Sequence, residues 1–160
     1  MLKTNYQKFA RNSFLLRLSF LSSLPAAFFA GLKAKEVTDE KVVTVVKYSW
    51  FTKNPFQSIY FACLAMAAEL STGLLLINLT TDSKPAISTL IVKNEATYYK
   101  KATGTILFTC SDGALIKEKV QQAITTGQGV LIEATSTGRN EKGEVVAEFK
   151  FTWSIKTKKS

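Results

Sequence analysis

The chain has 160 residues, of which 46% are hydrophobic, and this aromatic-rich, periodic sequence predicts one folded domain and excludes an intrinsically disordered chain. Lys and Arg residues number 21 against 12 Asp and Glu residues, and the net charge of +9 favours an anionic partner: a nucleic acid, a membrane surface or a phosphorylated ligand. The sequence has no histidine, which excludes Ser-His-Asp and Cys-His catalysis and the usual zinc sites that contain histidine.

The two cysteines, Cys63 and Cys110, both lie in apolar runs. This placement indicates buried free thiols rather than a disulfide or a metal-binding pair, and we expect no metal ion. Free thiols fit a reducing compartment, so we expect a cytoplasmic protein.

An apolar run near the N-terminus follows three basic residues: Lys3, Lys8 and Arg11. The pattern loosely imitates a secretory signal, which is one interpretation. Arg17 interrupts the apolar run, however, and Pro25 blurs any cleavage site. We therefore interpret residues 4–22 as an amphipathic helix, within a segment 1–24 that packs on the domain.

Two strands are predicted next, over residues 29–37 and 41–51, joined by a short polar turn at 38–40. The second strand is rich in Val and aromatic residues, as a half-buried strand should be.

A long apolar helix follows and runs to about Leu79. It begins either at Pro55, with Asn54 as the cap and Gln57 completing a capping box, or later, with Asn54 and Pro55 in a loop and Ser58 as the cap. Its faces are apolar nearly all round, so it must be covered on most sides. A carboxylate at its centre would cost about 2.5–3.5 kcal/mol at mid-bilayer, so we expect burial inside a sheet and no stable membrane insertion.

The second half of the chain predicts four strands and one inserted helix. The expected strands are residues 87–101, 103–110, 129–137 and 144–156, and the helix is 112–126, ended by Gly127. The last strand alternates apolar with mostly polar residues, as an antiparallel sheet on a core requires. Residues 157–160 are expected to be a frayed tail. The economical packing is an α+β fold in which one curved antiparallel sheet wraps around the long helix.

Glu69 is an unusual residue in this predicted helix, because its ionisable side chain lies in the middle of the most apolar segment. Desolvation should raise the pKa of this carboxyl group, which makes it a candidate general base or nucleophile. The alternative is a Glu at the helix edge that reaches solvent or a neighbouring backbone group.

The interval of fifteen residues between Asn54 and Glu69 resembles the hotdog-fold acyl-CoA thioesterases, in particular their small single-domain branch. That family carries an Asn, a His-Gly-Gly motif and then an Asp or Glu deep in the central helix. Tyr60 stands at the His position here, and Phe61 and Ala62 stand at the Gly-Gly position. The resemblance implies a hotdog fold over roughly residues 25–156.

The resemblance also implies roles. Glu69 would be the base or nucleophile, Asn54 would position the reacting groups, and the amides of Phe61 and Ala62 would polarise the thioester carbonyl, with Tyr60 beside the substrate. The side chains at Phe61 and Ala62 depart from the family pattern, because Gly-Gly lets a substrate approach the backbone closely.

Basic residues at strand ends and turns have two interpretations: Lys100, Lys101, Arg139 and Lys142. They could meet the phosphates of coenzyme A, with Lys100 and Arg139 as the substrate-binding candidates, or they could form a solvated basic face. The sequence shows no nucleic-acid-binding motif, so we expect no nucleic-acid partner.

By resemblance, the protein is expected to form a homodimer, or a dimer of dimers, through an exposed sheet edge. The expected function is hydrolysis of an acyl-CoA thioester by carboxylate-assisted attack of water, with coenzyme A only as part of the substrate and no other cofactor. The alternative is a non-catalytic acyl-CoA or lipid-binding hotdog module.

Overall fold

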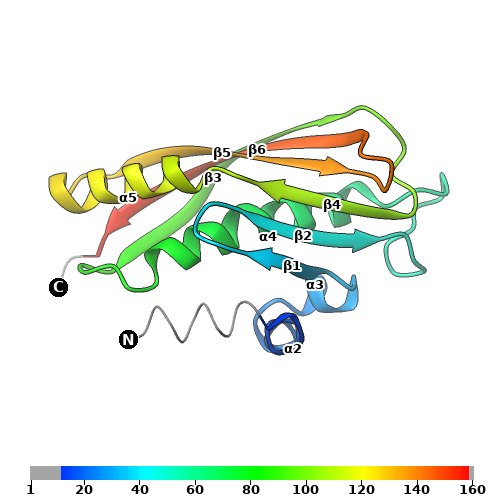
Figure 1. Ribbon diagram of the computed structural model, residues 1–160, viewed down its shortest axis with the longest axis horizontal. Helices are drawn as coiled ribbons and strands as arrows, with labels where there is room; N and C mark the ends of the chain where they lie inside the picture. The colour runs from blue at the N-terminus through cyan, green and yellow to red at the C-terminus, as the bar shows by residue number, and fades with distance from the viewer. Residues whose placement is uncertain (1–11, 159–160) are drawn as a thin grey trace.

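A curved antiparallel sheet wraps around one long helix in the computed structural model, which describes residues 12–158 (Figure 1). The sheet has six strands in the order β1-β2-β4-β5-β6-β3. The strands are β1 (Lys33–Val37), β2 (Val42–Lys47), β3 (Ile87–Tyr98), β4 (Thr105–Cys110), β5 (Val130–Arg139) and β6 (Val145–Thr157). The helices are α2 (Ser13–Ser23), α3 (Pro25–Phe29), α4 (Phe61–Thr80) and α5 (Gly113–Thr126). The predicted hotdog fold is confirmed.

Helix α4 is the core helix, and buried side-chain hydrogen bonds fasten it to the sheet. The Thr44 hydroxyl donates to the Ala67 carbonyl at 2.7 Å, and the Trp153 indole donates to the Thr72 hydroxyl at 3.2 Å. Among residues 12–158, α4 is the one helix long and apolar enough to cross a membrane, yet 67% of its apolar 18-residue stretch is buried inside the fold. Its apolar composition is therefore accounted for by the sheet around it.

Strand β6 supplies the largest apolar side chains of the core. Phe149, Phe151, Trp153 and Ile155 are buried, in the alternation that the sequence predicts. The rings of Phe149 and Phe151 stack with centroids 6.0 Å apart, and Phe108 of β4 meets Phe149 edge-on at 5.7 Å. The first pair lies within β6, and the second spans from β4 to β6 across β5, so these rings pack the core over three strands.

The N-terminal helices pack along the β1 edge. Asn12 caps α2 by accepting hydrogen bonds from two backbone amides, and Leu16 and Phe20 are buried beneath the helix. Residues 4–11 of the predicted helix lie outside the described residues. The prediction of a strand from residue 29 is wrong, because Pro25 starts the short helix α3 and β1 begins only at Lys33.

Strand β2 ends at Lys47, four residues before the predicted end. The Thr52 hydroxyl accepts from the Ser49 amide and donates to the Lys47 carbonyl at 2.7 Å, which turns the chain out of the sheet. Helix α4 then begins at Phe61 with Tyr60 as its N-cap, later than both predicted starts. Asn54 stabilises a loop, as the second alternative predicted, but Ser58 is not the cap.

Helix α5 packs on β5, β6 and the end of α4, and it buries Ile116, Val120 and Ala123. Gly127 ends it in the left-handed conformation, at φ 66°, as predicted. In Figure 1 it lies at the end of the molecule opposite the β2–α4 loop. The chain beyond it is more ordered than expected: β6 includes Thr157, and the Lys158 amide donates to the Ala86 carbonyl.

Both cysteines are buried and free, as predicted. Burial raises the pKa of the Cys110 thiol to about 12 and also raises the pKa of Cys63, so neither thiol forms a reactive thiolate readily.

Candidate functional site

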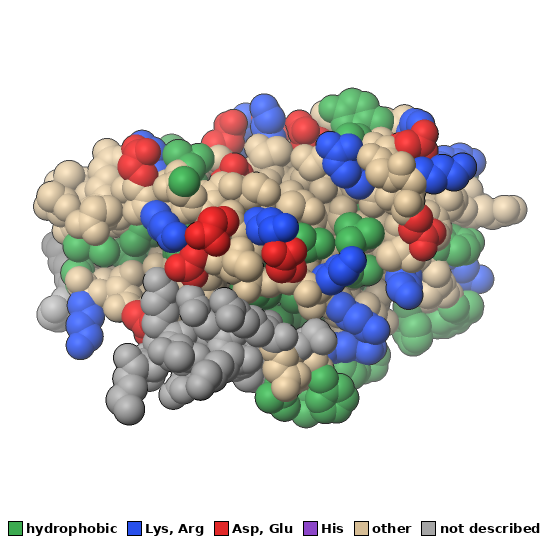
Figure 2. Space-filling model, in the orientation of Figure 1, with side chains coloured by type: hydrophobic (Ala, Val, Ile, Leu, Met, Phe, Trp, Pro, Cys, Tyr) green, Lys and Arg blue, Asp and Glu red, His purple; other side chains and the backbone are tan. Residues whose placement is uncertain are grey.

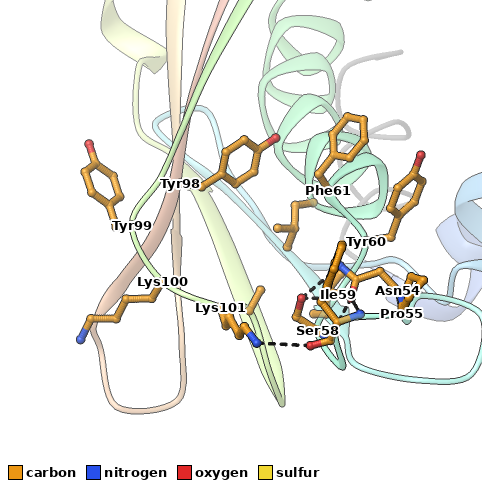
Figure 3. Close-up of a pocket in the computed structure, with 13 residues that line it drawn as sticks. Asn54, Pro55, Ser58, Ile59, Tyr60, Phe61, Tyr98, Tyr99, Lys100 and Lys101 are labelled. Atoms are coloured by element: carbon orange, nitrogen blue, oxygen red, sulfur yellow. Dashed lines mark hydrogen bonds between the residues drawn. The ribbon is translucent and has the colours of Figure 1, made fainter.

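A cavity of about 620 Å³ lies at the N-terminal end of α4. Its walls come from the loop between β2 and α4, from the first turn of α4 and from the connection between β3 and β4 (Figure 3). Four of the predicted site residues meet there: Asn54, Tyr60, Phe61 and Lys100. Segments distant in sequence therefore form one site, because the sheet brings the ends of β2 and β3 to the same end of the molecule.

Asn54 organises the loop that forms one wall of the cavity. Its side-chain oxygen accepts from the amides of Phe56 and Ser58 at 3.0 and 3.1 Å, and its amide nitrogen donates to the Ser58 hydroxyl at 3.0 Å. These bonds hold Gln57 in the left-handed region, at φ 59°. The Asn54 side chain is thus largely engaged with the loop itself.

The first amides of α4 are available for a ligand. Tyr60 is the N-cap and contributes no side-chain cap, while its carbonyl already accepts the Cys63 amide at 2.9 Å. Within the described part of the chain, the amides of Phe61 and Ala62 have no hydrogen-bond partner. The positive end of the helix dipole adds to the attraction for a carbonyl oxygen or an anion.

Aromatic and basic side chains complete the cavity. Figure 3 shows Tyr98 of β3 extending towards the beginning of α4, where Phe61 lies. Lys101 donates to the Phe56 carbonyl at 3.4 Å, which links the two loops, whereas Lys100 points away from Asn54 and pairs with Glu144. Hydrogen bonding to Lys100 lowers the pKa of Glu144, and burial raises the pKa of Tyr98. The structure adds Tyr98 and Tyr99 to the predicted set, and it places Lys101, one of the four basic residues considered for coenzyme A, in the same cavity.

Glu69 lies outside this cavity. It lines a second cavity of about 220 Å³ between α4 and the helices α2 and α3, together with Met66, Leu70 and Leu24. Eight residues separate it from Phe61, or about 12 Å along the helix axis. A single copy of the chain therefore does not bring Glu69 and Asn54 to the same cavity.

The carboxylate of Glu69 makes no hydrogen bond or ion pair with any described residue. Burial raises the pKa of this carboxyl group. One carboxylate oxygen lies over Gly73, 2.9 Å from where a Cβ would stand, so the absence of a side chain at Gly73 leaves room for it. Glu69 is thus a partly desolvated carboxylate on the outer face of the core helix.

The remaining predicted residues lie elsewhere. Ala62 follows Phe61 in the first turn of α4, and its side chain does not line the 620 Å³ cavity. Arg139 lines a third cavity of about 310 Å³ with Asp112 and Thr135, and its guanidinium donates to the Gly143 carbonyl at 2.9 Å. No group of three His, Cys, Asp or Glu side chains suited to a metal ion occurs among residues 12–158.

The sequence carries only a weak signal that Tyr98 and Tyr99 belong to this cavity. Tyr98 and Tyr99 end a strand, and the aromatic residues of a strand are usually assigned to a core. Only the return of β3 beside the start of α4 places them in a cavity.

Comparisons with known proteins address the fold. A family model described as a domain of unknown function (DUF4442) matches residues 16–155. Comparison with curated proteins gave no match.

Three solved structures illustrate the likeness. A protein of unknown function from Pseudomonas aeruginosa, named a "probable thioesterase", has a TM-score of 0.73 at 18% identity, covering 95% of this chain and 93% of that one. A thioesterase from Haemophilus influenzae has a TM-score of 0.64 at 13% identity and covers 88% of both chains. A thioesterase variant from Staphylococcus aureus has a TM-score of 0.61 at 15% identity, covering 81% of this chain and 97% of that one. Identities this low show a shared fold.

Proposed function

This chain belongs to the DUF4442 family, whose model spans residues 16–155, and on that premise we propose that the protein is a thioester hydrolase acting on an acyl-CoA. The proposal rests on the state of Glu69 in the core helix: its carboxylate is partly desolvated and has no hydrogen-bond or ion-pair partner among the described residues. Such a group is costly to retain unless it has a role. The names of the structural neighbours support the same reaction class.

The interval between Asn54 and Glu69 supports the assignment further. Two solved variants of the Staphylococcus aureus protein replace a Gln and a Glu that lie fifteen positions apart in that chain. Fifteen positions also separate Asn54 from Glu69.

In the proposed mechanism, the amides of Phe61 and Ala62 bind the thioester carbonyl oxygen and stabilise the negative charge that develops on it. Glu69 takes a proton from the attacking water, and its raised pKa makes it a stronger base than an ordinary carboxylate. Asn54 acts as a positioning residue by holding the loop before α4. Tyr60 and Lys100 contact the bound substrate, with Lys100 and Arg139 meeting the phosphates of coenzyme A.

A second protomer is needed in this proposal, because Glu69 and the 620 Å³ cavity do not meet within one chain. We propose a homodimer, or a dimer of dimers, that pairs through the edge strand β3 and joins the cavity of one protomer to the carboxylate of the other. The buried free thiols of Cys63 and Cys110 support a cytoplasmic location.

The test is release of the coenzyme A thiol from short, aromatic and long acyl-CoAs by the wild type and by Glu69→Gln. We expect hydrolysis by the wild type and a loss of about 10²-fold or more in kcat for the variant, since removing a general base commonly costs that much. Glu133→Gln, which changes an exposed carboxylate on β5, is the matched control. Full activity in Glu69→Gln would show that Glu69 is not the base.

A non-catalytic acyl-CoA or lipid-binding module is the second candidate. It is favoured by Phe61, whose exposed side chain stands where the hotdog thioesterases that the sequence resembles carry glycine, and so obstructs close approach to the backbone. Binding of an acyl-CoA by the wild type without any thiol release would establish this function in place of hydrolysis.

A further inference from the structure

An exposed aromatic cluster joins α3 to the loop between β2 and α4. The rings of Phe29 and Phe51 lie 6.4 Å apart, and Trp50 meets Phe51 edge-on at 5.0 Å. Trp50, Phe51 and Phe29 are 73%, 63% and 56% exposed. Two separate segments thus present their aromatic side chains to solvent side by side, which a monomeric soluble domain rarely does without a binding role.

Helix α2 extends this apolar surface. Its inner side buries Leu16 and Phe20, yet its outer side exposes Phe14, Leu18 and Leu21, which follow one another at helical spacing. Figure 1 shows α2 beside α3 at the same margin of the molecule. We call this surface the apolar flank; it consists of Phe14, Leu18, Leu21, Phe29, Trp50 and Phe51.

Lysines border the aromatic part of the apolar flank. Lys33 begins the strand after α3, Lys47 ends β2 three residues before Trp50, and Lys53 lies two residues after Phe51. None of the three forms an ion pair within the described part of the chain. Figure 2 shows hydrophobic side chains in green and basic ones in blue together over α3 and the adjoining loop. An apolar surface rimmed by unpaired cations matches the boundary of an anionic bilayer.

We propose that the apolar flank binds the surface of an anionic lipid membrane, with the aromatic side chains at the level of the acyl-chain boundary and the lysines at the phosphates. Trp and Phe are suited to this boundary, and each nearby Lys adds attraction to anionic headgroups. The core helix α4 stays inside the sheet, so the association is peripheral and differs from membrane insertion. The proposal does not depend on the hydrolase activity.

A second copy of the chain fits the apolar flank less well. A two-fold contact places the same patch of both copies face to face, which would bring like charges at Lys33, Lys47 and Lys53 together. The proposed dimer edge, β3, also lies at the opposite side of the sheet from β1, next to which α2 and α3 pack. Edge pairing therefore leaves the apolar flank free for a membrane.

Co-sedimentation of the full chain with vesicles tests the proposal. We expect binding to vesicles of phosphatidylglycerol and phosphatidylcholine, little binding to phosphatidylcholine alone, and release at high salt. Trp50→Ser with Phe51→Ser should weaken binding at least about tenfold. Each of Lys33→Gln, Lys47→Gln and Lys53→Gln should weaken it about fivefold.

Fluorescence provides a second readout, because Trp50 is exposed and the other tryptophan, Trp153, is buried. A blue shift on adding anionic vesicles would report Trp50 leaving water. The matched controls are Leu131→Ser and Lys156→Gln, an exposed apolar and a basic residue on β5 and β6, and both should bind like the wild type.

Two results would overturn the proposal. One is an unchanged affinity for anionic vesicles in the Trp50→Ser, Phe51→Ser protein. The other is a wild type that ignores all vesicles, in which case dissociation of the oligomer in that variant would assign the apolar flank to a protein interface. Circular dichroism of each variant confirms that the chain is folded.

Discussion

Glu69 combines two properties that rarely occur together in one side chain. It lies in the most apolar helix of the chain, and it makes no hydrogen bond or ion pair with a described residue. Burial disfavours its charged form, and so its folded-state pKa is raised above the value of an unfolded chain. The fold therefore favours the protonated form and is penalised when Glu69 ionises.

Stability should consequently depend on pH through Glu69. The favourable contribution of the protonated group is fully present below the unfolded-state pKa and is lost as pH rises through the raised folded-state pKa. At neutral pH we expect Glu69→Gln to melt at a higher temperature than the wild type, and this difference should vanish as the solution is acidified. Thermal unfolding across a pH series measures it, with Glu133→Gln as a control. A gap in melting temperature that is independent of pH would contradict this account.

Helix α5 is docked through a contact without space for a side chain. A Cβ at Gly113 would lie 2.1 Å from the Asp39 carbonyl oxygen, and the Gly113 amide donates to the Glu40 carbonyl at 3.2 Å. Asn78, near the end of α4, donates to the Thr38 carbonyl at 3.2 Å in the same turn. The β1–β2 turn thus joins the beginning of α5 to the end of α4.

Gly113→Ala should therefore destabilise the protein by about 1–3 kcal/mol or more, because the obstructing atom is backbone and cannot rotate away. Gly129→Ala is the matched control, since its Cβ would meet its nearest neighbour, the Ile155 carbonyl oxygen, at an ordinary 3.9 Å. Urea unfolding of the two variants makes the comparison. Equal midpoints would show that α5 and the turn separate easily.

At the scale of the whole molecule, β3 is an edge strand of 12 residues that pairs only with β6 among the described residues. Most of its side chains are exposed, and a register shift between Ile91 and Lys93 interrupts its pairing. A long edge of unpaired backbone groups invites a further strand, and a second β3 is the partner we propose.

Sedimentation should show a dimer or tetramer at micromolar concentration. Val92→Lys, which places a charge on the exposed part of the edge, should shift the protein towards monomer and lower any hydrolytic activity with it. Leu131→Lys introduces the same charge on the interior strand β5 and should leave the assembly intact. A wild type that sediments as a strict monomer would count against edge pairing.

The amino-acid sequence by itself determined the elements whose signals are local. The core helix could be predicted because its segment is long and apolar on nearly every face, so other elements must cover it. Strand β6 could be predicted from its strict alternation of apolar and polar residues. The end of α5 could be predicted because Gly127 readily adopts the left-handed conformation. The interval between Asn54 and Glu69 was also readable from the chain alone. These features depend on neighbours in sequence, which is why they could be predicted.

Only the tertiary structure decided where the chain turns and which residues meet. The sequence left Asn54 either as a helix cap or as part of a loop, since both arrangements satisfy the same side-chain oxygen with backbone amides, and the structure shows the loop. Glu69 lies outside the cavity of Asn54 because eight residues of helical rise, about 12 Å, separate it from Phe61, while Tyr98 joins that cavity because β3 returns beside α4. Contacts between distant segments depend on how the sheet curves around the helix, and local periodicity does not determine that curvature.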